Sequence, residues 1–323
     1  MTSAVELDAL AVALRTSPAL RAKRGIGLVG EVFGPGSWVH GPGDDGAVVN
    51  ADGTQVVACG EALLPAFVAA DPYGAGLAAV LTNVNDLAAM GASPLALVDT
   101  VTGQEPVARR VLKGMQWASG LYRIPVAGGH LTITDGPPSL SAFGLGRASK
   151  PLSVRRAAAG QALVFACCLD GQMRADYPFF PSFDERGGLL ADDVRLLAEG
   201  AARGWIASAK DVSMAGLVGS LAMLLECNRL GVILDLDGLP VPAGVPLDRW
   251  ITCFPCYAFL LCVPPRRVAE CLRAFAGRGL AAARAGTLDD TGRLRICSDG
   301  QIATAFDLSR ESVTNLSRES VTA

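Results

Sequence analysis

Residues 83–94, Asn-Val-Asn-Asp-Leu-Ala-Ala-Met-Gly-Ala-Ser-Pro, join the end of a long helical pattern to the start of a strand. The helical pattern runs from Asp71 to Met90, with Pro72 suited to a first turn and Gly91 suited to a helix stop. An apolar run over Pro94–Val101 then predicts a strand. This stretch therefore predicts a helix packed next to the strand that follows it.

The same alternation of strands and helices continues on both sides of this stretch. Two apolar runs, Ala47–Asn50 and Gln55–Cys59, flank an Asp-Gly turn and predict a hairpin. Further predicted helices cover 106–121, 189–203, 214–229 and Arg266–Ala276, and further predicted strands cover Ile124–Ala127, Leu140–Leu145, Ala162–Cys168, Val232–Leu236, Tyr257–Val263 and Leu280–Ala285. The pattern favours an α/β or α+β fold.

A change in composition around Arg147–Gly160 suggests a domain boundary. We predict a first domain over residues 1–150 and a second over 151–307. The last sixteen residues contain a direct repeat, because Leu-Ser-Arg-Glu-Ser-Val-Thr occurs at 308–314 and again at 316–322. We expect residues 308–323 to form a disordered tail that adds nothing to stability.

Composition excludes several classes of protein. The chain has 323 residues, of which 50% are hydrophobic and 18% charged, so it has ample material for packed cores. Its net charge of −3 lacks the basic surplus typical of nucleic-acid binders. No run approaches the roughly 18 apolar residues that span a bilayer, and Glu6 and Asp8 interrupt the place of a signal peptide. We expect a cytoplasmic protein without nucleic-acid or membrane partners.

Several common site motifs can be set aside. The segment Gly41–Gly46 matches G-x-G-x-x-G, but a strand follows it where a dinucleotide site needs a helix. There is no P-loop pattern, and the two histidines, His40 and His130, lie in no zinc-protease or hydrolase motif. Cys253 and Cys256 form a C-x-x-C pair before a strand-like run, which favours core residues over a redox pair, although a role for the pair stays open.

Acidic and glycine-rich junctions carry the chemistry that remains. Carboxylates that converge without basic partners usually hold a divalent cation, and nearby glycines let backbone amides approach phosphates. Exposed turn acids and helix caps are the alternative for each residue taken singly. The junctions are Asp44 and Asp45 before the hairpin, Glu61 after it, Asn83, Asn85 and Asp86 in the helix, Gly128-Gly129-His130 after a short strand, and Asp211 at an expected helix start.

The order of these junctions resembles the superfamily of aminoimidazole ribonucleotide (AIR) synthetase, called PurM-like, over roughly residues 20–307. Thiamine-monophosphate kinase, selenophosphate synthetase and the hydrogenase-maturation dehydratase belong to it. The stretch NDLAAMGASP is the most specific element, and KDVSMAGLVGSLAMLLE is most similar to the AIR synthase-related branch. The resemblance implies a two-domain fold whose N-terminal half-barrel domain pairs with its twin in a homodimer, plus a C-terminal α/β domain.

The resemblance also implies an ATP- and Mg²⁺-dependent enzyme that phosphorylates or activates an oxygen of a small molecule. Asp44, Asp45, Glu61, Asp86 and Asp211 match metal-binding positions. Asp45, Asn83, Asn85, Gly128, Gly129 and His130 match nucleotide-binding positions. The resemblance implies catalytic roles for His130 and for Lys23, which lies in a segment where relatives often contact phosphate.

Departures from the family pattern leave other functions open. Met214 stands where thiamine-monophosphate kinase has a second acid, no cysteine precedes Cys59, and 26 residues follow Cys297. The alternatives are a thiamine-monophosphate kinase-like enzyme and an ATP-binding dimeric scaffold without turnover. The sequence does not identify the phosphoryl acceptor.

Overall fold

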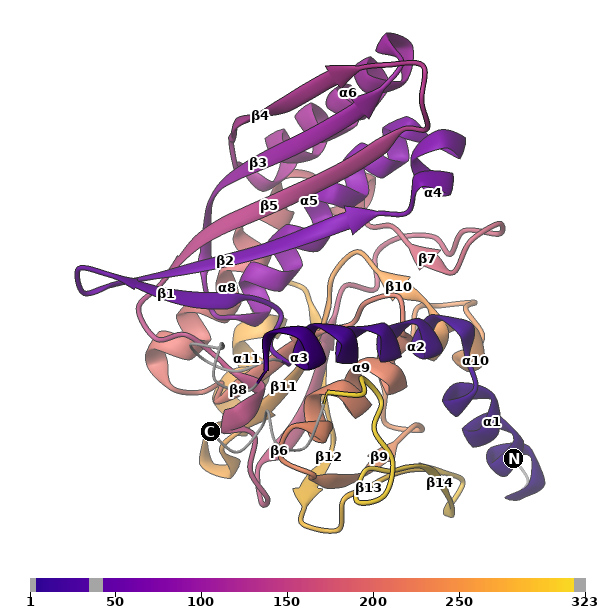
Figure 1. Ribbon diagram of the computed structural model, residues 1–323. Helices are drawn as coiled ribbons and strands as arrows, with labels where there is room; N and C mark the ends of the chain where they lie inside the picture. The colour runs from indigo at the N-terminus through magenta and orange to yellow at the C-terminus, as the bar shows by residue number, and fades with distance from the viewer. Residues whose placement is uncertain (1–3, 35–42, 317–323) are drawn as a thin grey trace. The chain divides into compact units, whose positions relative to one another are not determined.

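The computed structural model of the chain describes residues 4–34 and 43–316, which form two compact units (Figure 1). The five-stranded unit contains Asp45–Pro151 and Arg186–Ala202. The seven-stranded unit contains the described residues of Met1–Asp44, Leu152–Glu185 and Arg203–Ala323. The chain therefore passes from one unit to the other at four points. His40, Gly41 and residues 317–323 of the repeat lie outside the described residues.

The sheet of the five-stranded unit has the order β1-β2-β5-β3-β4. Neighbouring strands are antiparallel except for β3 and β4, which are parallel. The predicted hairpin is confirmed as β1 and β2, and its turn residues Asp52 and Gly53 both have positive φ, as a two-residue hairpin turn requires. The strand bounds are β1 Ala47–Ala51, β2 Thr54–Leu63, β3 Ser93–Gly103, β4 Val126–Ile133 and β5 Ser139–Ala148.

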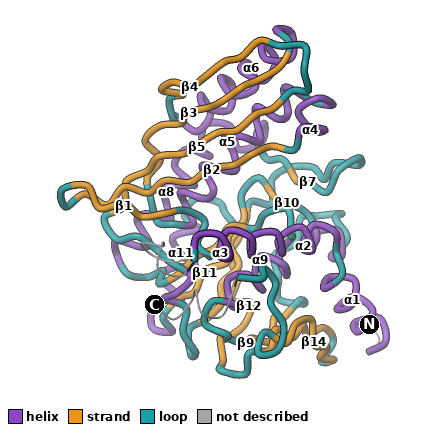
Figure 2. The backbone as a smooth tube through the Cα atoms, in the orientation of Figure 1, coloured by secondary structure: helices purple, strands orange, loops and turns teal. Residues whose placement is uncertain are grey.

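Helices α5 (Pro72–Ala89) and α6 (Glu105–Tyr122) pack against one face of this sheet, so that strands and helices form two layers (Figure 2). Two glycines allow the helices to touch. A Cβ at Gly76 would lie 2.1 Å from the Val111 carbonyl oxygen, and a Cβ at Gly114 would lie 2.2 Å from the Tyr73 carbonyl oxygen. Helices α4 (Pro65–Ala70) and α8 (Leu190–Arg203) complete the helical part of the unit. The last residue of α8, Arg203, is assigned to the seven-stranded unit.

The start and end of α5 follow from local sequence. The Asp71 carboxylate accepts a hydrogen bond from the Gly74 amide at 3.0 Å and caps the helix, and Pro72 occupies the first turn. Gly91 follows the helix with a φ of +66°, a conformation that glycine adopts without strain. The helix predicted over 71–90 is confirmed, and it fixes the position of the polar residues in its last two turns.

The sheet of the seven-stranded unit has the order β14-β13-β9-β12-β6-β11-β8. All residues of its inner strands β6 and β11 are buried, in keeping with their continuous apolar sequence. The bounds are β6 Ala162–Cys167, β8 Ser208–Asp211, β9 Gly231–Asp235, β11 Ala258–Val263, β12 Ala281–Asp289, β13 Arg293–Ser298 and β14 Gln301–Asp307. A separate parallel pair consists of β7 (Phe179–Phe180) and β10 (Phe254–Pro255).

The N-terminal helix α1 (Ala4–Arg15) packs on β14 and β13 and places Leu7, Ala11 and Leu14 in the core of this unit. This packing explains why the first residues of the chain belong with its C-terminal half. The other helices are α2 Pro18–Ala22, α3 Gly27–Phe33, α7 Phe183–Arg186, α9 Gly216–Glu226, α10 Leu247–Thr252 and α11 Val268–Ala276.

Residues 308–316 do not form the disordered tail that the sequence suggested. Leu308, Val313 and Thr314 are buried. The Glu226 carboxylate at the end of α9 accepts hydrogen bonds from the Val313 amide (2.8 Å), from the Thr314 hydroxyl (2.9 Å) and from the Ser312 hydroxyl. A half-buried acceptor therefore gives this polar segment a place in the fold that its composition does not reveal.

Candidate active site

Asp45 and Asp86 bring two carboxylates together within the five-stranded unit. Their carboxylate oxygens lie within 4.8 Å of one another. Asp45 comes just before β1, and Asp86 lies in the last turn of α5, where it is 8% exposed. The local causes are the hairpin and the helix end that the sequence predicted. Two carboxylates at this distance, with only oxygen donors, suit a hard cation such as Mg²⁺.

Cys59 on β2 lies beside this pair. Its Sγ contacts the Asn83 Oδ1 at 3.3 Å. Burial raises the pKa of the Cys59 thiol, and the negative charges of Asp86, Asp45 and Glu61 raise it further. The thiol is therefore kept protonated among three of the five predicted metal-binding acids.

The Asn83 side chain makes hydrogen bonds within the five-stranded unit. Its amide donates to the carbonyl oxygens of Ala79 (2.8 Å) and Ala142 (3.2 Å), which ties α5 to β5. Both amide hydrogens are thus engaged with main-chain oxygens. Asn85 is fully buried in the same helix.

Asp44 is directed into the seven-stranded unit. Its carboxylate accepts hydrogen bonds from the Ser153 hydroxyl (2.7 Å) and from the Val154 amide (2.6 Å), at the start of a short 3-10 helix. Burial raises the pKa of Asp44, against the opposing effect of these hydrogen bonds and of the positive charges of Arg155 and Lys210. Both oxygens of Asp44 are engaged by its own unit.

Asp211 is the last residue of β8, whereas the sequence suggested that it opens a helix. Helix α9 begins five residues later, at Gly216, whose φ is +70°. Asp211 is buried, and one carboxylate oxygen lies 2.9 Å from the Nζ of Lys210, which is buried as well. The correction has a simple cause: Lys210 and Asp211 pair with Leu260 and Phe259 of β11, and this long-range pairing has no local sequence signal.

Gly128, Gly129 and His130 lie within β4, and not in a turn after a short strand. β4 runs on to Ile133 because it pairs with β3 along that length. His130 is exposed and lies opposite Thr100. A Cβ at Gly129 would lie 2.6 Å from a carboxylate oxygen of Asp99, so glycine is required where this acid sits.

Asp99 and Lys210 are buried ionisable residues that the sequence reasoning missed. Asp99 is buried in β3, and burial raises its pKa. The sequence signal for Asp99 was a single acid within the largely apolar strand segment 94–103. For Lys210, the signal was a lysine directly before the predicted ligand Asp211. Lys23, predicted as catalytic, is half-buried in a short 3-10 helix, Lys23–Ile26, of the seven-stranded unit.

The C-x-x-C pair has the environment of core residues. Cys253 and Cys256 are fully buried, and all nine cysteines are free thiols. The Cys253 Sγ contacts the Trp250 carbonyl oxygen at 3.2 Å, and burial raises the pKa of Cys253 to about 12. A thiol held protonated in this way is a poor nucleophile at neutral pH.

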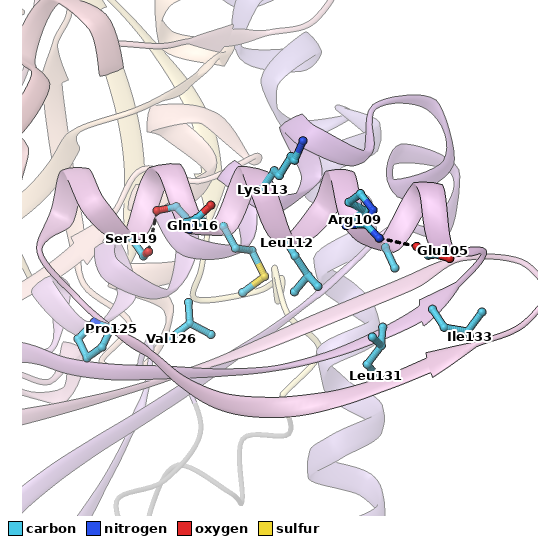
Figure 3. Close-up of a pocket in the computed structure, with 12 residues that line it drawn as sticks. Glu105, Arg109, Leu112, Lys113, Gln116, Ser119, Pro125, Val126, Leu131 and Ile133 are labelled. Carbon is cyan, nitrogen blue, oxygen red and sulfur yellow. Dashed lines mark hydrogen bonds and ion pairs between the residues drawn. The ribbon is translucent and has the colours of Figure 1, made fainter.

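A pocket of about 740 Å³ lies between α6 and β4 in the five-stranded unit (Figure 3). Leu112, Leu131 and Ile133 give it an apolar wall, and Arg109 and Lys113 project from α6 near its rim. Arg109 pairs with Glu105 one turn away on the same helix. The predicted metal ligands do not line this pocket. Among the described residues, no helix is long and apolar enough to cross a membrane.

Comparison with known families matches two consecutive parts of the chain. Residues 43–148 match the N-terminal domain of AIR synthase related protein, and residues 186–297 match its C-terminal domain. The uncharacterized protein sll0787 of Synechocystis sp. is 31% identical over 86% of this chain and 87% of its own length. A thiamine-monophosphate kinase of Rhodopirellula baltica is 27% identical over 71% of this chain and 77% of its own length.

Solved structures share the fold. PurL of Thermotoga maritima complexed with ADP has a TM-score of 0.70 at 18% identity over 84% of this chain, and the chain spans about half of that protein's length, 46%. AaThiL complexed with AMPPCP and TMP has a TM-score of 0.64 at 16% identity over 86% of this chain and 95% of its own length. The predicted two-domain PurM-like fold is thereby confirmed.

Proposed function

Because the chain belongs to the AIR synthase-related protein family, we propose that it is an ATP- and Mg²⁺-dependent enzyme that transfers a phosphoryl group to an oxygen of a small molecule. The proximity of Asp45 and Asp86 is the observation that carries this proposal. Relatives bound to ADP or AMPPCP support the use of ATP.

Asp45 and Asp86 are the residues we propose to hold Mg²⁺, and Asp44, Glu61 and Asp211 remain predicted ligands. The ion would neutralise charge on the phosphates. The contribution of the protein is positioning: two carboxylates fixed by a hairpin and a helix end need little reorganisation on binding. The protonated Cys59 thiol adds no charge to this cluster.

The nucleotide contacts that we propose are those that the sequence resemblance implies. We propose that the amides of Gly128 and Gly129, with Asn85, bind the nucleotide, and that His130 donates to the transferred phosphoryl group. Lys23 is the further cation that we propose to act on phosphate. Asn83 contributes indirectly, because its amide hydrogens hold the helix that carries Asp86.

A homodimer is the second part of the proposal. Residues such as Gly144 face α5, since a Cβ at Gly144 would contact Leu87. Alternation along β5 therefore directs Phe143 and Leu145 to the opposite face, where they are 43% and 38% exposed. Leu95 adds a further exposed apolar side chain on β3. Such a sheet face is typical of an interface between subunits, and a monomer in light scattering at micromolar concentration would contradict the homodimer.

Calorimetry with ATP, with and without Mg²⁺, tests the binding step. We expect tighter binding with Mg²⁺, and equal affinity in both conditions, or none, would contradict the proposal. Release of ADP with candidate acceptors tests the enzyme. The alternative of an ATP-binding scaffold gains support if Mg-ATP binds and no acceptor yields ADP. Met214, half-exposed where thiamine-monophosphate kinase has an acid, makes thiamine monophosphate the informative first acceptor to test.

A further inference from the structure

The pocket between α6 and β4 is a feature that the proposed function does not use. Its volume of about 740 Å³ lies in the range of about 300–1,000 Å³ that is usual for small-molecule sites. Ala108 and Met115 of α6 are buried at this pocket, whereas Leu131 and Ile133 of β4 are half-exposed. Its lining residues all belong to the five-stranded unit, so the pocket is defined within that unit alone.

The carboxylate of Asp99 lies on the pocket side of the sheet. Leu131 lines the pocket, so alternation along β4 places Gly129 on the same side as Leu131. A Cβ at Gly129 would lie 2.6 Å from an Asp99 carboxylate oxygen. Asp99 therefore occupies the space over β4 where a side chain at position 129 would stand, and the lining residues Val126 and Leu131 flank that position along the strand.

Asp99 is an acid without a compensating partner in the described part of the chain. It is 7% exposed, and among the described residues it has no hydrogen bond and no ion pair. Removing a carboxylate from water without a partner costs free energy. Burial accordingly raises the pKa of Asp99, and no neighbouring charge or donor opposes that effect. A cation bound beside Asp99 would remove this cost.

The basic side chains at the pocket do not supply that cation. Arg109 pairs with Glu105 on the same helix. Figure 3 shows Lys113 pointing away from β4. A ligand that compensates Asp99 must therefore carry the positive charge itself.

We propose that this pocket binds a small molecule with an apolar body and a protonated amine: the body packs against Leu112 and Leu131, and the ammonium group pairs with Asp99. Asp99 is not one of the lining residues, so the ammonium group must pass over Gly129, which has no side chain to block it. The site is separate from the proposed phosphoryl transfer, because alternation along β4 places His130 on the opposite face of the sheet.

Three probes with the same eight-carbon chain test the proposal, because n-octylamine, n-octanol and octanoate differ only in the head group. Calorimetry on the full chain at neutral pH, without nucleotide, measures their affinities. We expect n-octylamine, a cation at this pH, to bind about tenfold more tightly than n-octanol, and octanoate to bind most weakly. Asp99→Asn keeps the shape of the side chain and removes its charge, so this variant should bind n-octylamine and n-octanol equally.

Leu131→Gln separates binding in the pocket from general adsorption of amphiphiles. Leu131 is half-exposed, so the variant should fold, and it should bind all three probes several-fold more weakly. Ile302→Gln replaces a similarly exposed apolar residue of the seven-stranded unit and should match the wild type.

Several results would overturn the assignment. These are equal binding of n-octylamine and n-octanol by the wild type, a preference for the amine that persists in Asp99→Asn, and unchanged binding by Leu131→Gln. Tightest binding of octanoate would assign the pocket to anions instead, and no binding of any probe would also refute the site. If Asp99→Asn does not fold, the comparison of amine with alcohol in the wild type still decides. None of these outcomes bears on ATP binding, so this inference and the proposed function fail separately.

Discussion

Asp44 and Asp45 are neighbours in the chain, yet their carboxylates serve different units. Asp44 accepts hydrogen bonds from Ser153 and Val154, whereas the oxygens of Asp45 approach those of Asp86. The peptide bond between the two residues is also a point where the chain passes from one unit to the other. A pair that looks uniform in the sequence therefore divides into an anchoring acid and a candidate ligand.

Substitution of each acid should separate these roles. We expect Asp45→Asn to weaken Mg-ATP binding by about 1–3 kcal/mol, because the substitution removes a charged ligand. We expect the melting temperature of this variant to stay nearly unchanged. Asp44→Ala removes the acceptor for Ser153 and Val154 and should lower the free energy of unfolding by about 1–3 kcal/mol. Calorimetry and thermal melting measure the two effects. The same loss of stability in both variants would refute the division.

Helix packing in the five-stranded unit should be sensitive to one methyl group. Gly76→Ala places a Cβ 2.1 Å from the Val111 carbonyl oxygen and should destabilise the protein by about 1–3 kcal/mol, since α5 and α6 must separate. Gly120 of α6 is the matched control, because a Cβ there meets nothing within 4 Å. Gly120→Ala should stabilise by about 0.5–1 kcal/mol. Urea unfolding measures the change in the free energy of unfolding for each variant, and the two changes should have opposite signs.

The C-terminal segment should contribute to stability through Glu226. Glu226→Gln keeps the size of the side chain and removes the negative charge that Ser312, Val313 and Thr314 share. We expect a loss of about 1–3 kcal/mol, which differential scanning calorimetry would record as a drop of several degrees in melting temperature. Deleting residues 312–323 should produce at least the same drop. If both proteins melted like the wild type, the anchoring role of Glu226 would be untenable.

Asp99 should make stability depend on pH in an uncommon direction. Burial raises its pKa, so the folded protein holds this proton more tightly than the unfolded chain does. Stability from this group is fully present below its ordinary pKa of 3.8 and falls as pH rises through the raised value. Asp99→Asn should therefore be more stable than the wild type at neutral pH, with a gap that closes toward pH 4. Thermal melts of the wild type and of Asp99→Asn across this range measure the gap, and a constant gap would contradict the prediction.

His130 should affect turnover more than binding if it donates to the transferred phosphoryl group. We expect His130→Ala to reduce ATP turnover at least tenfold, or about 1.4 kcal/mol, with ATP affinity nearly unchanged. Substitution of the other histidine, His40, should do neither. Turnover at saturating Mg-ATP measures the effect, and equal rates for His130→Ala and wild type would remove this residue from the mechanism.

The sequence predicted the elements whose signals are local. Pro72 and Gly91 delimit α5, and the Asp-Gly turn marks the first hairpin, so both elements were found. Strand β8 was missed because its four residues include a buried lysine and a buried aspartate, which have low strand propensity and are held there by pairing with β11.

Prediction of the candidate site had the same limit. Asp45 and Asp86 could be identified because Asp45 lies directly before a predicted hairpin and Asp86 lies near the end of a clear helical pattern. The separate directions of Asp44 and Asp45 could not, since hydrogen bonds from residues more than one hundred positions away decide where Asp44 points. The burial of Lys210 beside Asp211 was also not recognised, because burial of a charged residue depends on tertiary neighbours.

The four passages of the chain between the units have a practical consequence for dissecting the protein. A gene cut after residue 150 yields an N-terminal fragment that lacks α8 of the five-stranded unit and a C-terminal fragment that lacks α1 of the seven-stranded unit. Each fragment would carry a piece of the other's core, so neither could reach its native structure by itself. The two halves of the gene are thus suited to a split-protein complementation assay, in which a signal would arise only when both are synthesised in the same cell.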